Sequence, residues 1–295
     1  MTAAKLRDNS DMKNSYFKGA SAPGLVEETV ASRFDRIAGD YPDRDALVVR
    51  HQDIRWSWAE YRVEVEKLAN GLLALGIGAG DRVGIWAPNC YEWVLTQFAT
   101  AKIGAILVCI NPAYRVFELE YALNKSACRA IISAERFKSS LYLDMLQRLA
   151  PELDVCEPGR LKSEKLPLLE IVIRMGDEQT PGMFNFNQVC NMGLDQDLER
   201  LQEIQAGLSV HDVINIQFTS GTTGNPKGAA LTHHNILNNA NQVAAGMKFT
   251  EYDRLCIPVP LYHCFGMVLG NLACVTRGAT AVFPADAFEP ASVLE

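Results

Sequence analysis

Residues 211–232 read HDVINIQFTSGTTGNPKGAALT, a strand pattern followed by a glycine-rich loop and a second short strand. Three glycines stand within 218–228, and ordering a glycine costs more entropy than ordering any other residue. A plain connection would avoid that cost. Unshielded backbone N–H groups, hydroxyls and the cation of Lys227 suit a loop that wraps an anion such as a phosphate chain. The alternative is a solvated linker, but linkers rarely carry Pro-Lys-Gly between strong strand and helix signals.

The rest of the chain alternates between helix and strand patterns. A capping-box pair, Ser57 and Glu60, opens one predicted helix. Further helices are predicted at 137–149 and 265–276, loops at 151–167 and 177–182, and strands at 46–50, 82–86, 105–110, 128–134, 168–175, 254–260 and 279–284. This alternation predicts an α/β fold with mainly parallel sheets covered by helices.

Composition limits the classes of function. A chain of 295 residues with 48% hydrophobic and 21% charged residues can bury a large core. The formal charge of −7 argues against a general nucleic-acid or anionic-membrane surface, because such surfaces need clustered Lys and Arg. No apolar run reaches the roughly 18 residues of a spanning helix, so no transmembrane segment is expected.

The eight cysteines form no CxxC pair, and several lie inside apolar runs. They are interpreted as reduced core residues of an intracellular protein, not as a disulfide frame or a zinc site. We therefore expect a cytoplasmic protein. The alternative is the mitochondrial matrix, although Asp8 and Asp11 interrupt the acid-poor character of a transit peptide.

Several familiar catalytic and nucleotide-binding motifs do not fit. A Walker A loop requires Gly-Lys-Ser/Thr, whereas Lys227 lies between Pro226 and Gly228. The glycine cluster at 76–84 follows a helix pattern and precedes a strand, which favours a helix C-cap over a dinucleotide loop. No GxSxG surrounds Ser220 and no HExxH occurs, so hydrolase interpretations lack their nucleophile or metal site.

A second informative stretch is PVPLYHCFG at 258–266. It follows a predicted strand and should place Tyr262 and His263 at the carboxyl edge of a sheet, where open α/β folds bind ligands. On the residues alone, His263 can be either a structural or a functional histidine. His233 and His234 are expected to flank the next helix and not to act as ligands.

FTSGTTGNPKG followed by ALTHHN, and then PLYH, resembles the AMP-forming acyl-CoA synthetases of the adenylate-forming superfamily. The resemblance covers nearly everything after about residue 25. It implies that a medium-chain fatty acid attacks the α-phosphate of ATP, with Mg²⁺, and that the thiol of coenzyme A then displaces AMP from the acyl-adenylate. Such chemistry needs positioning and charge neutralisation instead of a protein nucleophile.

The same resemblance implies roles for individual residues. His263 becomes the candidate catalytic residue, at the mouth of the acyl and pantetheine passages. Hydroxyls donate to the ATP phosphates, glycines allow close backbone approach, and a lysine balances charge. This cofactor-binding set is Thr219, Ser220, Gly221, Thr222, Thr223, Gly224, Asn225, Pro226 and Lys227.

Family members extend well beyond this sequence, into an aspartate that grips the ribose, the Mg²⁺ ligand and a C-terminal domain with a catalytic lysine. We therefore expect a tail at 1–25 and an incomplete N-terminal adenylation domain at 26–295, inactive alone and prone to form a homo-oligomer. The strand at 279–284 is expected to keep an open edge, and the strand at 46–50 to lack partners. The alternatives are an inactive nucleotide-binding or interaction fragment and an adenylating enzyme for aryl or amino acids.

Overall fold

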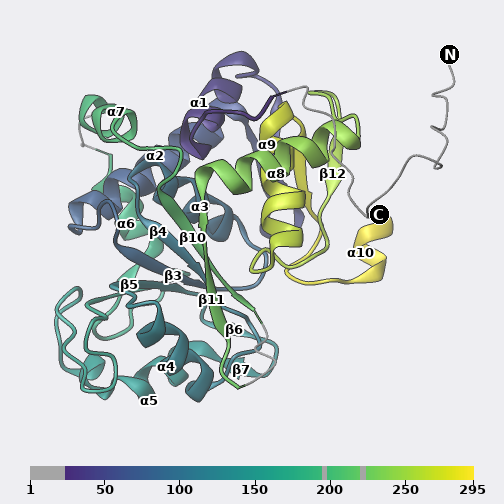
Figure 1. Cartoon of the computed structure of the whole chain (residues 1–295). Helices are drawn as coiled ribbons and strands as arrows, with labels where there is room; N and C mark the ends of the chain where they lie inside the picture. Colours follow the sequence, from purple (N-terminus) through teal and green to yellow (C-terminus); the bar gives the residue numbers. More distant parts are fainter. Residues whose placement is uncertain (1–23, 195–197, 220–223) are drawn as a thin grey trace, which may run out of the picture.

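The computed structural model describes residues 24–194, 198–219 and 224–295. Its larger sheet has seven strands in the order β11-β10-β4-β3-β5-β8-β9. All neighbours are parallel except β11, which runs antiparallel to β10 along one edge (Figure 1). The strands are β3 (Arg82–Trp86), β4 (Ile106–Cys109), β5 (Ala130–Ser133), β8 (Ile171–Arg174), β9 (Phe184–Asn185), β10 (Val213–Thr219) and β11 (Lys227–Thr232). The predicted, mainly parallel α/β fold is confirmed.

A second sheet of four strands has the order β12-β13-β1-β2, with β1 (Asp45–Val49), β2 (Ile54–Ser57), β12 (Arg254–Cys256) and β13 (Thr280–Phe283). Strand β13 lies between β12 and β1, and Leu47 is opposite Ala281. The prediction of an open edge at 279–284 is therefore wrong, because β12 covers one side and β1 the other. The prediction that β1 lacks partners is also wrong, since β2 and β13 flank it.

Helices cover both faces of the larger sheet (Figure 1). Helices α1 (Val30–Asp40), α2 (Trp58–Ala74) and α3 (Tyr91–Lys102) lie on one face, and α4 (Val116–Lys125) and α5 (Tyr142–Leu149) on the other. Side chains alternate between the two faces along β4 and the residue after it. Leu107 and Cys109 belong to the core cluster shared with α1–α3, while Val108 and Ile110 belong to the cluster shared with α4 and α5. The predicted capping box of Ser57 and Glu60 opens α2.

The remaining elements differ in part from the sequence prediction. The helix expected from residue 137 begins only at Tyr142, because a small hairpin of β6 (Arg136–Phe137) and β7 (Ser140–Leu141) precedes it. The helix expected at 265–276 is a π-helix, η4 (Phe265–Leu272), followed by α9 (Ala273–Arg277). The other elements are η2 (Arg50–Gln52), η3 (Pro151–Asp154), α6 (Phe186–Met192), α7 (Leu198–Ala206), α8 (His233–Gly246) and α10 (Pro290–Leu294).

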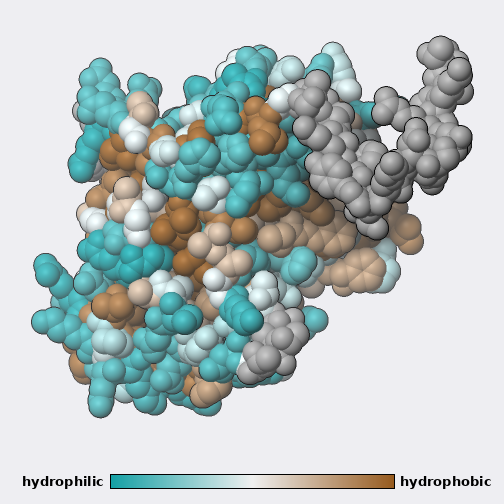
Figure 2. Space-filling model, viewed as in Figure 1, coloured by the Kyte–Doolittle hydropathy of each residue, from teal (hydrophilic) through white to brown (hydrophobic). Residues whose placement is uncertain are grey.

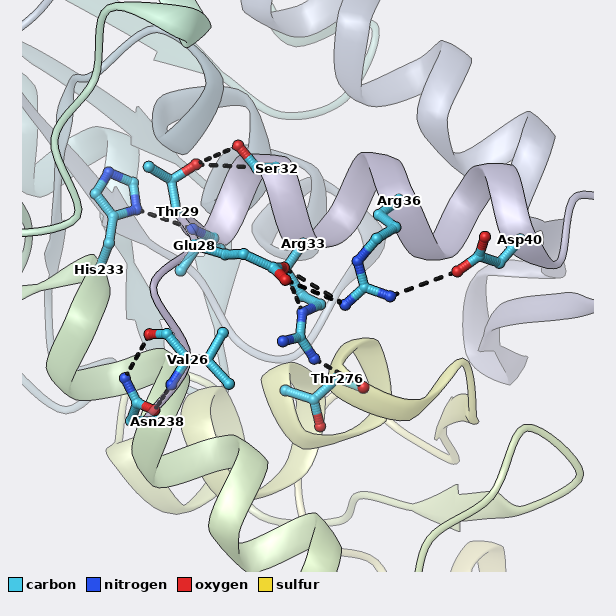
Figure 3. Close-up of polar contacts among 11 residues, drawn as sticks. Val26, Glu28, Thr29, Ser32, Arg33, Arg36, Asp40, His233, Asn238 and Thr276 are labelled. Atoms are coloured by element: carbon cyan, nitrogen blue, oxygen red, sulfur yellow. Dashed lines mark hydrogen bonds and ion pairs between the residues drawn. The ribbon is translucent and has the colours of Figure 1, made fainter. Parts of the chain in front are cut away.

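Residues between Val26 and Val30 contact α8, more than 200 residues further along the sequence (Figure 3). The backbone N–H of Val26 donates to Asn238 Oδ1 at 2.7 Å, and Asn238 Nδ2 donates back to the Val26 carbonyl at 3.0 Å. Val30 N donates to His233 Nδ1 at 3.1 Å. Arg33 pairs with Glu28 at 2.7 Å. As predicted, His233 flanks the start of a helix.

Candidate functional site

The topology of the larger sheet marks one place where a crevice should open. Helix α3 carries the chain from β3 to β4 in one direction along the sheet, whereas the chain leaves β5 for β8 in the other direction. The connections of the adjacent strands β3 and β5 therefore leave in opposite directions. At such a switch point the loops after the strands diverge, and open α/β sheets bind ligands in the crevice between their carboxyl ends.

A pocket of about 440 Å³ lies at this point. Residues of the β6–β7 hairpin and residues that follow β3, β4, β12 and β13 line it, so both sheets contribute to its wall. They are Ala87, Pro88, Asn89, Asn111, Pro112, Ala113, Phe137, Lys138, Pro260, Leu261, Tyr262, Asp286, Ala287 and Phe288. Two large apolar side chains nearby, Phe265 and Phe288, are more than half exposed. Figure 2 shows hydrophobic residues gathered in the middle of the visible face, with hydrophilic residues around them.

The glycine-rich loop joins β10 to β11 as the turn of an antiparallel hairpin. Thr219 lies opposite Lys227 in the register, and Thr219 Oγ1 approaches the Lys227 carbonyl at 3.4 Å. Gly224 has φ 133°, in a region that side-chain-bearing residues rarely adopt. Tyr121 on α4 donates from its hydroxyl to the Pro226 carbonyl at 3.2 Å, which fixes the returning strand. The loop therefore emerges at the carboxyl end of β10, beside β4.

Asn89 and Gln217 hold the segment that carries His263. Asn89 follows β3, donates from Nδ2 to the Val259 carbonyl at 3.0 Å, and accepts from the Leu261 N–H at 2.8 Å. Gln217 on β10 donates from Nε2 to the Tyr262 carbonyl. The segment is thus fixed to the larger sheet from two different strands.

His263 itself is exposed and lies two residues before the first residue of η4, with Cys264 between them. Its Nδ1 accepts from the Phe265 N–H at 3.1 Å, so the proton of the neutral ring is on Nε2. Gly266 allows the close approach behind it, because a Cβ at this position would lie 2.7 Å from the Pro260 carbonyl carbon. π-helical turns such as η4 are frequent at functional sites.

The family model of AMP-binding enzymes matches residues 34–295, nearly the whole chain. The chain belongs to the AMP-binding enzyme family. This confirms the resemblance inferred from the glycine loop and the PLYH motif.

Relatives within the AMP-binding enzymes are similar along almost all of the chain. The mitochondrial medium-chain acyl-CoA ligase ACSF2 of Danio rerio is 47% identical over 280 residues, 94% of this chain and 46% of the relative. The protein of the same name in Homo sapiens is 44% identical over 286 residues. The chain therefore spans about half the length of the curated relatives it matches.

Solved structures of CoA ligases have a similar fold. The anthranilate-CoA ligase AuaEII, crystallised with anthranoyl-AMP, gives a TM-score of 0.74 at 22% identity and covers 90% of this chain and 46% of its own. A long-chain-fatty-acid-CoA ligase from Archaeoglobus fulgidus gives 0.72 at 24% identity, covering 91% and 50%. At these identities the likeness concerns the fold alone.

The structure brings together the two stretches that the sequence singled out. Thr219, Gly224, Asn225, Pro226 and Lys227 lie in the hairpin at the carboxyl end of β10, and Tyr262 lines the pocket. The other predicted phosphate-binding residues, Ser220, Gly221, Thr222 and Thr223, lie outside the described residues. The roles assigned to this set, and to His263, remain predictions.

Sequence reasoning did not single out Asn89 and Gln217. Both are nearly buried, with 2% and 6% of their surface exposed. A polar residue directly after a buried strand, as in APN, or inside an apolar strand, as in INIQF, is a signal that could have found them, because buried polar groups need specific partners.

The cysteines near His263 are not suited to act as nucleophiles in this AMP-binding enzyme. Burial raises the pKa of the Cys264 thiol, and burial raises that of Cys109 to about 12. Because the thiolate is the reactive form, both remain inert near neutral pH. This agrees with a reaction that needs positioning and charge neutralisation instead of a protein nucleophile.

In the part of the chain that the structure describes, no group of three or more His, Cys, Asp or Glu side chains could hold a metal ion. Along the same described ranges, no helix combines the length and apolar composition needed to cross a bilayer.

Proposed function

We propose that the protein carrying this chain activates a medium-chain fatty acid in two steps, with ATP and then coenzyme A. The observation that carries the proposal is the position of the glycine hairpin, by which we mean the described residues Thr219 and 224–227 at the end of the β10–β11 pair. It opens at the same sheet edge as the Tyr262–His263 segment. The family match and the medium-chain acyl-CoA ligases among the relatives support it.

The hairpin residues fit a phosphate chain. Lys227 is exposed at the hairpin end and supplies a cation where the loop begins its return. Gly224 leaves its backbone unshielded, and a built Cβ there would meet nothing within 4 Å. Because β10 leads into a strand and not a helix, the donors must be backbone N–H groups and hydroxyls of the loop instead of a helix N-terminus.

ATP supplies a leaving group that turns a carboxylate into an acyl electrophile. The chain's contribution is to hold the phosphates with the hairpin and to place the acyl group near the pocket. A charge-assisted hydrogen bond from Lys227 would stabilise the negative charge that shifts between phosphate oxygens. The apolar surface beside the pocket, including exposed Phe265 and Phe288, suits an acyl chain.

Mg²⁺ is proposed only as a companion of ATP. This ion usually binds through substrate phosphates and one or two carboxylates. The described residues offer no acidic cluster for it, and we assign it no protein ligand.

We also propose where in the cell the protein is located, from the names of its relatives. The two ACSF2 relatives are named mitochondrial, which favours the matrix over the cytoplasm expected from composition. Fluorescence imaging of the full-length product with a C-terminal tag, against a matrix marker, would distinguish the two compartments.

The test of the function is the exchange of labelled pyrophosphate into ATP, measured on the full-length product of the gene. We expect exchange that depends on added fatty acid and is greatest with acids of medium length. An aryl or amino acid as the only effective substrate would overturn the substrate class. A folded protein that gives no exchange with any carboxylic acid would overturn the function.

A further inference from the structure

Gln217 occupies a junction between the two stretches of the candidate site. It lies on β10, two residues before Thr219, with Cys109 of β4 on one side and Ala229 of β11 on the other. Only 6% of its surface is exposed. Gln217 is therefore enclosed within the sheet between β4 and β11.

The amide of Gln217 reaches out of the sheet to the His263 segment. Its Nε2 donates to the carbonyl of Tyr262, the residue directly before His263. Because a carbonyl can only accept, this contact fixes which end of the amide faces Tyr262. No partner among the described residues hydrogen-bonds Gln217 Oε1, although that atom is buried. The side chain is thus held in place chiefly by its bond to Tyr262.

We propose that Gln217 is a positioning residue that couples the glycine hairpin to His263. The inference rests on the function proposed above, since it assumes that nucleotide binds at the hairpin. The carbonyl of Tyr262 and the backbone of His263 share one peptide unit, which is planar and rigid. Holding that carbonyl against β10 therefore fixes the position of the His263 Cα, from which the side chain extends.

Asn215 provides a matched comparison on the same face of the same strand. It is also buried, with 2% of its surface exposed, and its Oδ1 likewise has no partner among the described residues. Its Nδ2, however, donates to the Leu107 carbonyl of β4 at 3.1 Å. A second contact of Nδ2, with Cys109 Sγ at 3.2 Å, is also on β4, so replacing Asn215 should remove bonds within the sheet and leave the Gln217–Tyr262 bond in place.

The first experiment follows amide hydrogen exchange in the full-length product with and without ATP. In the wild type, we expect ATP to slow exchange both in the hairpin and at 257–264. In Gln217→Met, which keeps the length of the side chain but cannot donate, protection should remain in the hairpin and disappear from 257–264. Asn215→Leu should behave as the wild type.

Two results would overturn the coupling: equal protection of 257–264 in Gln217→Met and wild type, or the same loss in Asn215→Leu. A wild type that does not bind ATP at all would overturn the proposed function and the coupling with it. Binding of ATP without any protection of 257–264 would overturn the coupling alone.

The second experiment separates positioning from stability by steady-state kinetics. Loss of one positioning hydrogen bond should lower kcat of Gln217→Met about tenfold and leave KM for ATP within about twofold. Gln217→Glu should regain rate as the pH falls, because a protonated acid can donate to the Tyr262 carbonyl whereas a carboxylate cannot. A Gln217→Met variant with unchanged kcat, or a Gln217→Glu variant without this pH dependence, would refute the role.

Discussion

Lowering the pH from 7.5 to 5 should weaken the fold through one side chain, His233. This imidazole is 1% exposed, and its Nδ1 accepts a hydrogen bond from the Val30 N–H at 3.1 Å. Burial lowers the pKa of His233 from 6.5 to about 4, although the charge of Asp212 opposes the shift. Protonation would place a charge in the core and remove the acceptor that Val30 needs.

The sign follows from comparing folded and unfolded chains. Between pH 6.5 and 4, the unfolded chain binds a proton at this histidine that the folded chain does not bind. The stability that depends on a neutral His233 is therefore fully present above pH 6.5 and decreases as the pH falls toward 4. With these two pKa values, the free energy of unfolding decreases by about 2 kcal/mol at pH 5. The decrease reaches about 3 kcal/mol at a pH low enough to protonate His233 in the folded form as well.

The assay is urea unfolding of the wild type and of His233→Gln at pH 7.5 and pH 5. Glutamine keeps an oxygen that can accept from Val30 but does not titrate, so the difference in pH dependence between the two proteins isolates His233. His211→Gln, at an exposed position, is the control and should follow the wild type. An equal loss of stability in the wild type and His233→Gln would refute the reasoning.

Three further changes test the site. Lys227→Ala in the full-length product should slow adenylation about 10- to 100-fold at subsaturating ATP, as expected for a charge-assisted hydrogen bond of roughly 1.5–3 kcal/mol; unchanged rates would contradict the role in phosphate binding. Gly266→Ala should destabilise the fold by about 1–3 kcal/mol in urea unfolding, because its Cβ would lie 2.9 Å from the Leu261 nitrogen. Gly246→Ala, where a Cβ meets nothing within 4 Å, is its control, and similar stabilities of the two would refute the close approach. Asn89→Leu should cost roughly 1–3 kcal/mol for each of the two backbone groups that it leaves unpaired, at Val259 and Leu261, measured in the same way; a variant as stable as the wild type would show that these bonds do not hold the segment.

Local signals predicted the parallel sheet well, because β3, β4, β5 and β8 are mostly buried and mostly apolar runs bounded by turns. Helix α7 escaped notice because only Leu201 in it is buried, so its apolar stripe is narrow. The π-helix could not be distinguished from an α-helix, since both bury the apolar residues of one compact segment.

The least predictable features depend on partners far away in the sequence. The covered edge of β13 needs β1, and nothing local to 279–284 announces that pairing. Asn89 and Gln217 bond to backbone carbonyls, which every residue has, at sequence distances of 170 and 45. Because any residue can supply a backbone carbonyl, the residue type at the partner position does not indicate the bond. The predicted tail at 1–25 and the homo-oligomer stay predictions.

The bonds between Val26 and Asn238 span 212 residues, and that separation sets an order of events during synthesis. At roughly 5–20 residues per second, a ribosome needs about 10–40 s to make the intervening chain. During this interval the first helix and strand β1 have emerged, but neither α8 nor β13 exists to receive them. The larger sheet, whose strands β3, β4 and β5 are close neighbours in sequence, can assemble first. Proteolysis of ribosome-stalled chains should therefore find 82–133 protected before 26–57. Simultaneous protection of the two segments would show that 26–57 folds before α8 and β13 are made.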